Sequence, residues 1–516
     1  MRQQQDISHY DVLIIGGGVN GVGIARDAAG RGLRVCLAEM HDLASATSSW
    51  STKLIHGGLR YLESYEFKLV RESLIEREIL LNAAPHLIEP LRFILPHHAG
   101  LRPAWLLRLG LFLYDHIGGR RLLPATQKIT LPGSSYGAPL KPDFKLGFEY
   151  SDCRVDDARL VLANAIDAAA RGADIYLRTK VMAAARVDGV WRVRLQAGGE
   201  IRDVMAKTLV NAAGPWVTQL YQAIDGVTPT KKLRLVKGSH LFVKAHYAHD
   251  RAYIFQHADG RIVFAIPYRH DLTLIGTTDE PYDGNPADAK ISDDEISYLC
   301  DLVSEYFNQP ITPSDVVSTY SGVRPLFDEL GKGDASKVTR DYAFEVQDHN
   351  GTAPFLAIYG GKLTTYRKLA LDALKSLQPY LPTMGPEWTK TARLPGGEMG
   401  YQGFAAFIDE IKRSYPFLPD EMVQRLCTSY GSAVRQILGN AKALADLGTH
   451  FGADLYAAEL EHMRQCEWAH TAQDALTRRS KLYLKLSEAE QQKVAAWFTS
   501  AVEDHAVAER TPATAG

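Results

Sequence analysis

Short apolar runs bounded by glycine mark the start of the chain. Residues 11–15 (DVLII) form an apolar run rich in β-branched residues that ends at a glycine cluster, which predicts a buried parallel strand. Residues 19–31 then place small and polar side chains at helical spacing, and residues 34–39 (RVCLAE) predict a second strand. Together these three segments predict a βαβ unit.

The rest of the chain divides into a mixed region, a strand-rich middle and a helical end. Helical patterns occur at residues 67–82 and 156–171, and strand patterns occur at residues 175–186, 191–195 and 208–210. Between residues 231 and 346, alternating patterns such as HLFVKA, RIVFAI and LTLIGT predict an antiparallel sheet. Proline and glycine gather at residues 381–400, and beyond them nearly every pattern is helical.

These patterns predict an α/β protein with a Rossmann-like dinucleotide-binding lobe, an antiparallel-sheet substrate lobe and a C-terminal all-helical domain. We place both lobes in residues 1–385 and the helical domain in residues 390–516. The substrate lobe is expected mainly in residues 226–347. The dinucleotide-binding lobe is expected mainly in three stretches, residues 8–100, 145–225 and 348–380.

Composition narrows the class of protein. Of 516 residues, 46% are apolar and 23% charged, which excludes disordered, collagen-like and coiled-coil chains. The net charge of -2 gives no general attraction for nucleic acid, so we expect no nucleic-acid partner. The 5 cysteines are scattered singly and no His, Cys and carboxylate cluster has ligand spacing, so we expect reduced thiols and assign no metal. Without a recognisable export signal, a cytoplasmic location is expected.

Three glycines follow the first strand in the pattern G-x-G-x-x-G. Gly16 allows the tight turn, Gly18 lets the backbone approach a pyrophosphate, and Gly21 lets the helix pack closely on the sheet. The helix N-terminus offers unpaired N–H groups to the phosphates. Glu39, at the end of the second strand, would accept hydrogen bonds from the adenosine ribose. The pattern predicts a dinucleotide site but does not separate FAD from NAD.

Further motifs occur in a fixed order along the chain. They are ATSSWSTKLIHGGLRYLE at residues 46–63, NAAGPW at 211–216, YSGVRPL at 320–326 and GGKLTTYRK at 360–368. Together they resemble the FAD-dependent aerobic glycerol-3-phosphate dehydrogenases, and DALTRRSKL at residues 474–482 resembles the C-terminal helical domain of that family. The resemblance covers essentially the whole chain.

The resemblance implies a flavoprotein with FAD in the Rossmann-like lobe. It implies oxidation of sn-glycerol-3-phosphate to dihydroxyacetone phosphate by hydride transfer from C2, with membrane quinone as electron acceptor. Trp50 and Thr52 depart from the family pattern, since smaller or serine residues are expected there. The related glycerol phosphate oxidases carry a longer middle insert, and its absence here favours the dehydrogenase over the oxygen-reducing oxidase.

His56, in KLIHGG, is the expected catalytic base. A neutral imidazole is suited to accept the C2 hydroxyl proton, and the family's proposed base falls at this position. The alternative is a histidine that only hydrogen-bonds backbone in a turn. His240, in KGSH, is the second candidate and an expected substrate contact.

The phosphate of the substrate needs cations, because charge-assisted hydrogen bonds are shorter and stronger than neutral ones. Arg60, Arg324 and Lys362 match family motifs, and we expect them to act with His56 in catalysis and to bind the substrate. Tyr61 would add a hydroxyl or a ring wall. For any one arginine the alternative is a solvated surface side chain.

Several more residues are expected to line the flavin. Gly361 follows another glycine and would bring backbone N–H groups close to the ring system, as in related two-lobed flavoproteins. Residues 211–214 would support FAD from the far side, or form a small-residue turn without a ligand. Asp156 and Asp157 are expected to cap the following helix. Besides Gly16, Gly18, Gly21 and Glu39, the expected FAD contacts are Asn20, Ser48, Ser49, Lys53, Leu54, His56, Ala213, Gly214, Gly361, Leu363 and Thr364.

Residues 101–124 (LRPAWLLRLGLFLYDHIGGRRLLP) combine apolar and aromatic side chains with four arginines. This composition suits a helix lying in the lipid headgroup region, and a buried core helix is the alternative. Because quinone dissolves in lipid, we expect peripheral attachment to the inner face of the plasma membrane. We also expect a homodimer. The functional alternatives are another two-lobed flavin oxidase, such as an amino-acid oxidase, and a non-enzymatic flavin-bearing redox sensor.

Overall fold

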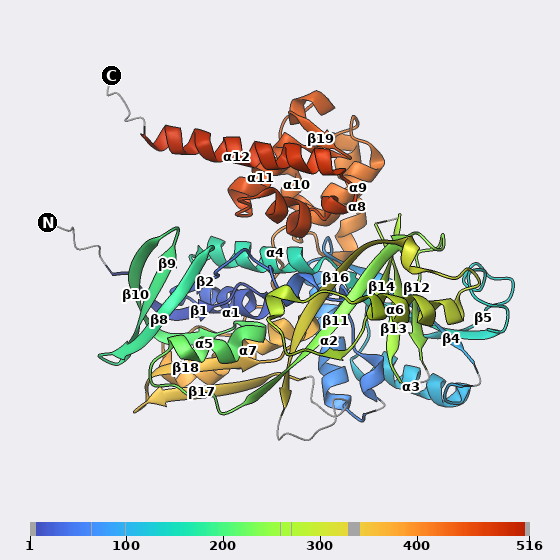
Figure 1. Cartoon of the computed structure of the whole chain (residues 1–516), viewed down its shortest axis with the longest axis horizontal. Helices are drawn as coiled ribbons and strands as arrows, with labels where there is room; N and C mark the ends of the chain where they lie inside the picture. The colour runs from blue at the N-terminus through green and yellow to red at the C-terminus, as the bar shows by residue number, and fades with distance from the viewer. Residues whose placement is uncertain are drawn as a thin grey trace.

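Figure 1 shows two lobes side by side with a helical domain above them. The computed structural model describes residues 7–62, 64–98, 100–257, 260–269, 271–328 and 341–510. The predicted fold class is confirmed: an α/β protein with a dinucleotide-binding lobe, a second sheet-based lobe and a C-terminal helical domain.

The first lobe is built on a sheet of 8 strands whose centre is parallel. β1 (His9–Ile15) lies between β2 (Val35–Ala38) and β10 (Glu200–Asn211). The sheet continues to β7 (Asp174–Tyr176) on one side and to β18 (Thr352–Tyr359) and β17 (Ala343–His349) on the other, with the hairpin of β8 (Thr179–Val187) and β9 (Val190–Ala197) joined to β10. The predicted βαβ unit is therefore confirmed.

Both faces of this sheet are buried because β1 is apolar on both sides. Val12 and Ile14 pack with a cluster that includes three helices, whereas Leu13 and Ile15 pack with the side of the β8–β9 hairpin. The helices are α1 (Val19–Gly30), α4 (Asp157–Ala170) and α7 (Tyr366–Leu377). A strand buried on both faces reads as a continuous apolar run, which is why the pattern at residues 11–15 was informative.

The second lobe holds a mostly antiparallel sheet of 10 strands. Its predicted part consists of β11 (Lys232–Lys244), β12 (Ala252–Gln256), β13 (Ile262–Tyr268), β14 (Leu272–Gly276), β15 (Glu280–Pro281) and β16 (Val316–Asp328), with α6 (Asp293–Tyr306) packed on it. The remaining strands come from earlier in the chain: β3 (Leu54–Ile55), β4 (Ile88–His97), β5 (Gln127–Thr130) and β6 (Leu146–Val155).

This strand sharing corrects the expected lobe boundaries. Residues 88–97 and 146–155 were placed in the dinucleotide-binding lobe, yet β4 and β6 pair with each other and, through β12, join the second sheet. The chain thus crosses between the lobes several times. α2 (Phe67–Ala83) and the segment around residues 54–62 lie where the lobes meet.

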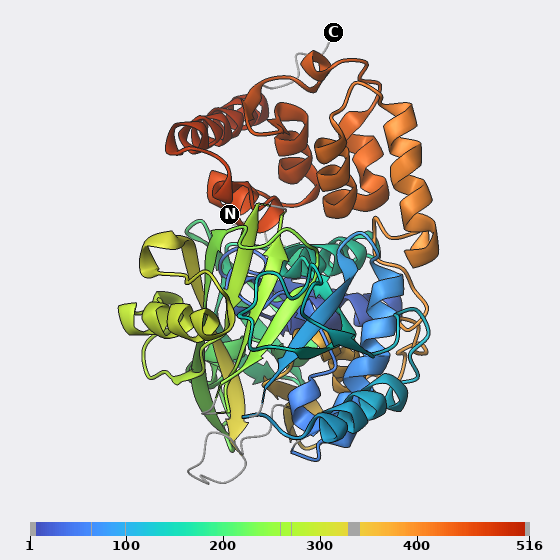
Figure 2. The same ribbon diagram turned by 90° about the vertical axis from the view of Figure 1, so that its right-hand side faces the viewer.

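The C-terminal domain has its own apolar core and is almost entirely helical. Its helices are α8 (Gly400–Ser414), α9 (Asp420–Tyr430), α10 (Val434–Leu438), α11 (Ala457–Cys466) and α12 (Glu488–Arg510). A small hairpin of β19 (His450–Gly452) and β20 (Leu455–Tyr456) is the exception to the all-helical prediction. Figure 2 shows this domain above the lobes.

α3 (Ala104–Ile117) lies on the surface, which excludes the alternative of a buried core helix. Leu111 and Tyr114 are buried, but Trp105 and Phe112 are 68% and 56% exposed. Within the described residues, no helix is long and apolar enough to cross a bilayer.

Candidate functional site

The glycine loop after β1 has the backbone that the fingerprint predicts. Gly16 has φ +114°, and a Cβ atom there would lie 2.6 Å from the carbonyl oxygen of Ala212. A Cβ atom on Gly21 would lie 1.9 Å from the carbonyl oxygen of Gly16. Gly18 is the N-cap of α1, and the Val19 amide donates to Ser48 Oγ at 3.0 Å. Only glycine fits at positions 16 and 21, because any side chain would displace this loop.

Glu39 lies beside the glycine loop at the end of β2, as expected. Its carboxylate accepts hydrogen bonds from the backbone amides of Gly17 at 2.6 Å and His41 at 2.8 Å. Burial raises the pKa of Glu39, and these two hydrogen bonds oppose that rise. The acid is therefore held at the place where an adenosine ribose would meet the sheet edge.

The second glycine pair, Gly360 and Gly361, meets the first helix through Asn20. Asn20 Nδ2 donates to the carbonyl oxygen of Gly360 at 3.2 Å. Gly361 has φ +105°, and a Cβ atom there would lie 3.0 Å from Asn20 Nδ2. Asn20 Oδ1 is buried and has no hydrogen-bond partner among the described residues. A buried acceptor without a hydrogen-bond partner, placed between two glycine loops, fits a site in which a polar cofactor would donate the hydrogen bond.

The turn after β10 closes the same end of the sheet. Asn211 is fully buried; its Nδ2 donates to the carbonyl oxygen of Val217 at 2.8 Å, and its Oδ1 accepts from the Ala213 amide at 3.2 Å. Gly214 follows with φ +56°. The turn is thus self-supporting, and Ala212 within it contacts Gly16.

Residues 47–52 bind the first lobe to the second. Thr47 Oγ1 donates to the carbonyl oxygen of Val323 at 2.7 Å, and the Tyr320 hydroxyl donates to the carbonyl oxygen of Ser51 at 2.7 Å. Trp50, one of the two departures from the family pattern, packs its ring 5.5 Å from that of Tyr320. The segment expected to line the flavin is therefore held against β16.

Lys53 and its counter-ion Asp157 hold residues 49–51 in place. Its ammonium donates to both oxygens of Asp157 at 2.9 and 3.0 Å and to the carbonyl oxygen of Ser49 at 2.9 Å. Asp157 is fully buried and also accepts from the Ser51 hydroxyl at 2.8 Å. Of the two expected helix caps, Asp156 accepts from the Arg159 amide, but Asp157 is the counter-ion of Lys53. The ammonium of Lys53, expected to line the flavin, is thus engaged in this ion pair. Leu54 follows in the buried strand β3.

His56 lies against the GGKLTTYRK motif of residues 360–368. The His56 amide donates to Thr364 Oγ1 at 3.2 Å, and Leu363 and Thr364 lie in the short helix directly after Lys362. Beneath His56, the Gly57 amide donates to the Tyr114 hydroxyl at 2.8 Å.

A buried network that sequence reasoning missed supports this turn. The Tyr114 hydroxyl donates to Asp152, which also pairs with Arg77 at 2.7 Å. No local signal marked it, because Arg77 and Asp152 lie among other charged residues in their segments and are 75 positions apart. Burial raises the pKa of the Tyr114 hydroxyl, so Tyr114 stays a neutral donor.

The expected cations lie on three different elements. Lys362 Nζ lies 3.9 Å from the centre of the Tyr61 ring, a cation–π contact. Arg324, on β16, donates to the carbonyl oxygen of Thr278 at 3.0 Å and to Asp279 at 3.1 Å. Arg60 is exposed on the turn before α2 and pairs with no acid in the described part of the chain. The structure thus joins Lys362 with Tyr61 but leaves Arg60 in solvent.

His240 is buried against the same segment. Its Nε2 lies 2.9 Å from Thr52 Oγ1, and its ring stacks on Tyr320 with 4.7 Å between centres. Burial, together with the charges of Lys53 and Arg324, lowers the pKa of His240 well below its usual value. His240 is therefore neutral at physiological pH and adds no positive charge for a phosphate.

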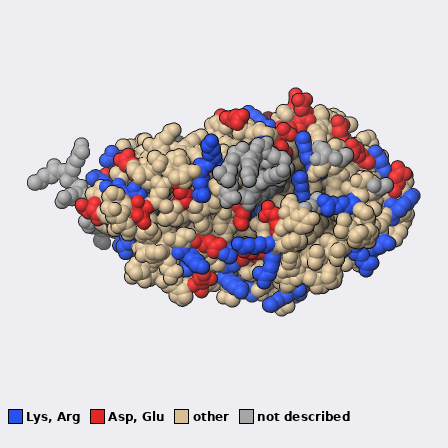
Figure 3. Space-filling model, turned by 90° about the horizontal axis from the view of Figure 1, so that it is seen from below, with Lys and Arg blue, Asp and Glu red and all other residues tan. Residues whose placement is uncertain are grey.

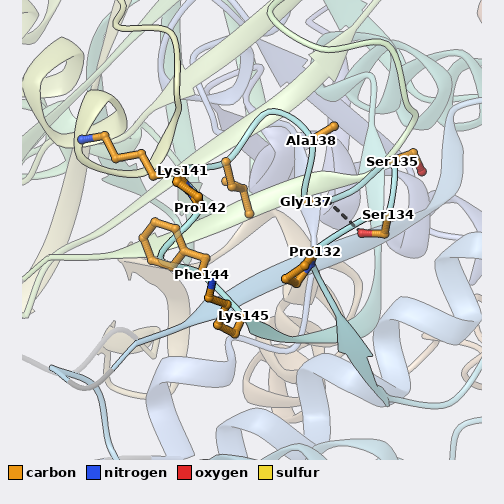
Figure 4. A pocket seen from close by; sticks show the side chains of 11 residues that line it. Pro132, Ser134, Ser135, Gly137, Ala138, Lys141, Pro142, Phe144 and Lys145 are labelled. Atoms are coloured by element: carbon orange, nitrogen blue, oxygen red, sulfur yellow. Dashed lines mark hydrogen bonds between the residues drawn. The ribbon is translucent and has the colours of Figure 1, made fainter.

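Other features lie outside this site. A surface hollow of about 540 Å³ is formed by the loop between β5 and β6, where Ser134 Oγ accepts from the Gly137 amide at 3.0 Å (Figure 4). It contains none of the expected site residues. Among the described residues, no group of three or more His, Cys, Asp or Glu side chains could hold a metal ion.

The chain is similar to known proteins over almost its whole length. Residues 11–367 match the family model "FAD dependent oxidoreductase", and residues 388–503 match "C-terminal domain of alpha-glycerophosphate oxidase". A D-erythritol 1-phosphate dehydrogenase of Brucella abortus is 49% identical over 95% of this chain and 98% of its own. A glycerol-3-phosphate dehydrogenase of Pseudomonas aeruginosa is 49% identical over 95% of each chain.

A solved structure agrees with these sequence matches. The glycerol-3-phosphate dehydrogenase of Bacillus halodurans, complexed with FAD, superposes with a TM-score of 0.76 at 31% identity, covering 98% of this chain and 92% of that one. The family resemblance of the motifs and FAD as the cofactor are confirmed.

Proposed function

Because the chain belongs to the FAD-dependent glycerol-3-phosphate dehydrogenase family, we propose that it oxidises sn-glycerol-3-phosphate to dihydroxyacetone phosphate and passes the electrons to membrane quinone. One observation supports this above the others. Three motifs far apart in the sequence, at residues 46–63, 320–326 and 360–368, meet beside the glycine loop through Thr47, Tyr320 and Thr364. These motifs contain His56, Arg324 and Lys362, to which we assign the chemistry below.

We assign the removal of the C2 hydroxyl proton to a residue of this chain and the removal of the hydride to the cofactor. FAD, when bound, would supply the acceptor for a hydride from C2 of the substrate. His56 accepts the proton of the C2 hydroxyl as the carbonyl forms, so the substrate loses one hydride and one proton. Gly57, held by Tyr114, fixes the backbone on which His56 lies.

Arg324 and Lys362 bind the phosphate in our proposal. Arg324 is held in place by Thr278 and Asp279, and a glycine at position 238 leaves room for its guanidinium, since a Cβ atom there would lie 2.6 Å from Nη2. A fixed guanidinium binds a phosphate with less loss of side-chain freedom than a mobile one. Arg60 would move from solvent to join them when substrate enters.

The membrane supplies the second substrate. The exposed side chains of α3, together with two aromatic residues before and at the start of α2, form an apolar surface that we call the α3 patch. It consists of Tyr65, Phe67, Trp105, Leu109, Phe112 and Leu113. The patch belongs to the end of the molecule opposite the helical domain, and Figure 3 shows that both basic and acidic side chains lie among uncharged surface on this underside.

We therefore propose that the α3 patch rests on the inner face of the plasma membrane. An amphipathic surface helix with aromatic side chains and nearby cations such as Arg108 suits the headgroup region of anionic lipid. A homodimer remains a further prediction, to be tested by light scattering of the purified enzyme.

An anaerobic titration tests the function. The purified yellow protein is titrated with sn-glycerol-3-phosphate while flavin absorbance is followed, and a short-chain quinone is then added. We expect bleaching by the substrate and recovery by the quinone. A flavin-loaded sample that does not bleach would contradict the proposed substrate, and fast reoxidation by oxygen alone would favour an oxidase.

D-Erythritol 1-phosphate is the second candidate substrate. A relative with 49% identity is named for that substrate, and the departures Trp50 and Thr52 contact Tyr320 and His240 in the second lobe. Both phosphates carry the same dianion and a secondary alcohol, so the same residues could serve either. Comparing kcat/KM for the two in one preparation decides between them.

A further inference from the structure

The segment after α11 reaches from the helical domain into the first lobe. Residues 474–481 form a turn of π-helix and its exit, and four of their charged side chains are at least nine-tenths buried: Asp474, Arg478, Arg479 and Lys481. The function proposed above assigns none of them a role.

Two arginines of this segment share one carboxylate of the first lobe. Arg479 donates to both oxygens of Asp42, one of them at 2.8 Å, and Arg478 donates to Asp42 Oδ2. Arg479 is fully buried and Asp42 is 3% exposed. We call these three residues the arginine clamp. Breaking the clamp is costly, because removing one partner would leave a buried charge without compensation.

Asp42 belongs to the turn that carries the expected ribose ligand. Glu39 lies three residues before it, and two residues after it the Ala44 amide donates to the carbonyl oxygen of Gly17 at 3.1 Å. Gly17 in turn donates to Glu39. Besides burial, the charge of Asp42 raises the pKa of Glu39, so the charge that the arginines balance acts on Glu39 directly.

Neighbouring contacts of the same segment reach both sides of the site. Asp474 pairs with Arg178, whose amide donates to the carbonyl oxygen of His41 at 2.9 Å. Lys481 Nζ donates to Asp156 at 3.0 Å and lies 3.9 Å from Asp157, the counter-ion of Lys53.

The backbone at these contacts is unusual. Of the 11 residues other than glycine with positive φ among those described, four carry or flank these contacts: Ala44, Lys53, Arg178 and Lys481. Such conformations persist where the surroundings hold them, and they gather at ligand sites.

We propose that Arg478 and Arg479 are positioning residues for FAD: by fixing Asp42 they hold the 39–45 turn in the shape in which Glu39 and the Gly17 loop bind the adenosine half of the cofactor. The helical domain thereby controls how tightly FAD is retained. This inference rests on the proposed role of Glu39 in the FAD site.

The release of FAD from diluted holoenzyme, followed by the fluorescence of free flavin, tests the clamp. We expect Arg479→Ala to release FAD at least tenfold faster, and Arg479→Lys to be intermediate because it keeps the charge but loses the paired hydrogen bonds. With FAD in excess, KM for sn-glycerol-3-phosphate should stay within about twofold of wild type, because the clamp contacts none of the proposed substrate residues.

Arg425→Ala is the matched control. Arg425 is partly buried in the helical domain and pairs with Asp454 and Glu459, away from the 39–45 turn. It should lower thermal stability yet leave FAD release unchanged. Equal release from wild type and Arg479→Ala, or equally faster release from Arg425→Ala, would overturn the proposal. If Arg479→Ala does not fold, Arg479→Lys and Arg425→Lys are compared by the same criteria.

The variant Glu39→Ala distinguishes a failure of the proposed FAD site from a failure of the arginine clamp. If Glu39→Ala retains FAD as wild type does, the proposed FAD site is wrong. If Glu39→Ala releases FAD faster and the Arg479 variants do not, the FAD site stands and the arginine clamp is wrong.

Discussion

His56 and His240 lie near the same segment in different environments. His240 is buried and its low pKa makes it a weak base, whereas His56 is half-buried on a turn that Thr364 and Tyr114 hold from two sides. A general base works best with a pKa near the operating pH. This contrast favours His56 over His240 as the residue that accepts the substrate proton.

We expect His56→Gln to lower turnover by roughly 100-fold to 10,000-fold, the usual contribution of general-base catalysis. FAD loading, measured as the ratio of flavin absorbance to protein absorbance, should not change. His349→Gln, an exposed histidine on β17, is the control and should keep full turnover. Normal turnover in His56→Gln would remove His56 from the role.

Arg324 should act on substrate binding. Hydrogen bonds to charged groups contribute about 1.5–3 kcal/mol each, so we expect Arg324→Ala to raise KM for sn-glycerol-3-phosphate roughly 10-fold to 100-fold. Flavin reduction by high concentrations of glycerol, which has no phosphate, should be unaffected. An unchanged KM would show that Arg324 does not bind the phosphate.

Among the elements, the sequence predicted those whose partners are close in the chain. β1, α1 and β2 lie within two residues of the expected bounds, because a strand, a glycine turn and a helix each have a local signal. The expected strand at residues 175–186 is divided into β7 and β8, since Arg178 has φ +52° and turns the chain. No strand was predicted at residues 88–97, which form β4, and these residues were assigned to the wrong lobe, because strands pair with partners far away in the chain.

The same limit applies to the site. Its motif residues could be predicted, because each motif is contiguous and resembles a known family. Asp157 was read only as a cap, since the position before a helix explains an aspartate without reference to Lys53. The pairing of Asp42 with Arg479 joins residues 437 positions apart, and no local pattern reports such a contact.

The α3 patch should decide attachment to lipid. We expect the double variant Leu109→Asp, Phe112→Asp to co-sediment at least tenfold less with vesicles of anionic phospholipid, because two charges would enter the headgroup boundary in place of apolar surface. Ile201→Asp, a change at a 60% exposed residue on β10, is the control and should sediment as wild type does. If the double variant and Ile201→Asp lose co-sedimentation equally, or if the double variant sediments as wild type does, the patch is not the membrane contact.

For the whole molecule, we expect the buried histidine His86 to contribute to how stability depends on pH. His86 lies where the lobes meet the helical domain, next to Gly396, and burial followed by the charge of Arg159 lowers its pKa to about 3. Below about pH 6.5 the unfolded chain binds a proton at this histidine that the folded chain does not. The contribution of His86 to the free energy of unfolding is therefore present above about pH 6.5 and is lost as the pH falls toward about 3.

This loss should amount to about 2 kcal/mol between pH 7 and pH 5 for His86. Replacing it should remove that part, so we expect the free energy of unfolding of His86→Leu to fall about 2 kcal/mol less than that of wild type over this interval. Urea unfolding at both pH values measures the difference. His349→Leu, at an exposed position, should keep the wild-type pH dependence; the same dependence in His86→Leu would contradict the assignment.

The central position of β1 has a consequence during synthesis. β1 is complete when residue 15 leaves the ribosome, but its neighbour β10 ends at residue 211 and the next strand, β18, at residue 359. At about 5–20 residues per second, β1 waits roughly 10 to 40 s for β10. Through that time the nascent chain carries an apolar strand with an open edge, a template for pairing with other chains. Chains that terminate before residue 211 keep this edge permanently and should aggregate.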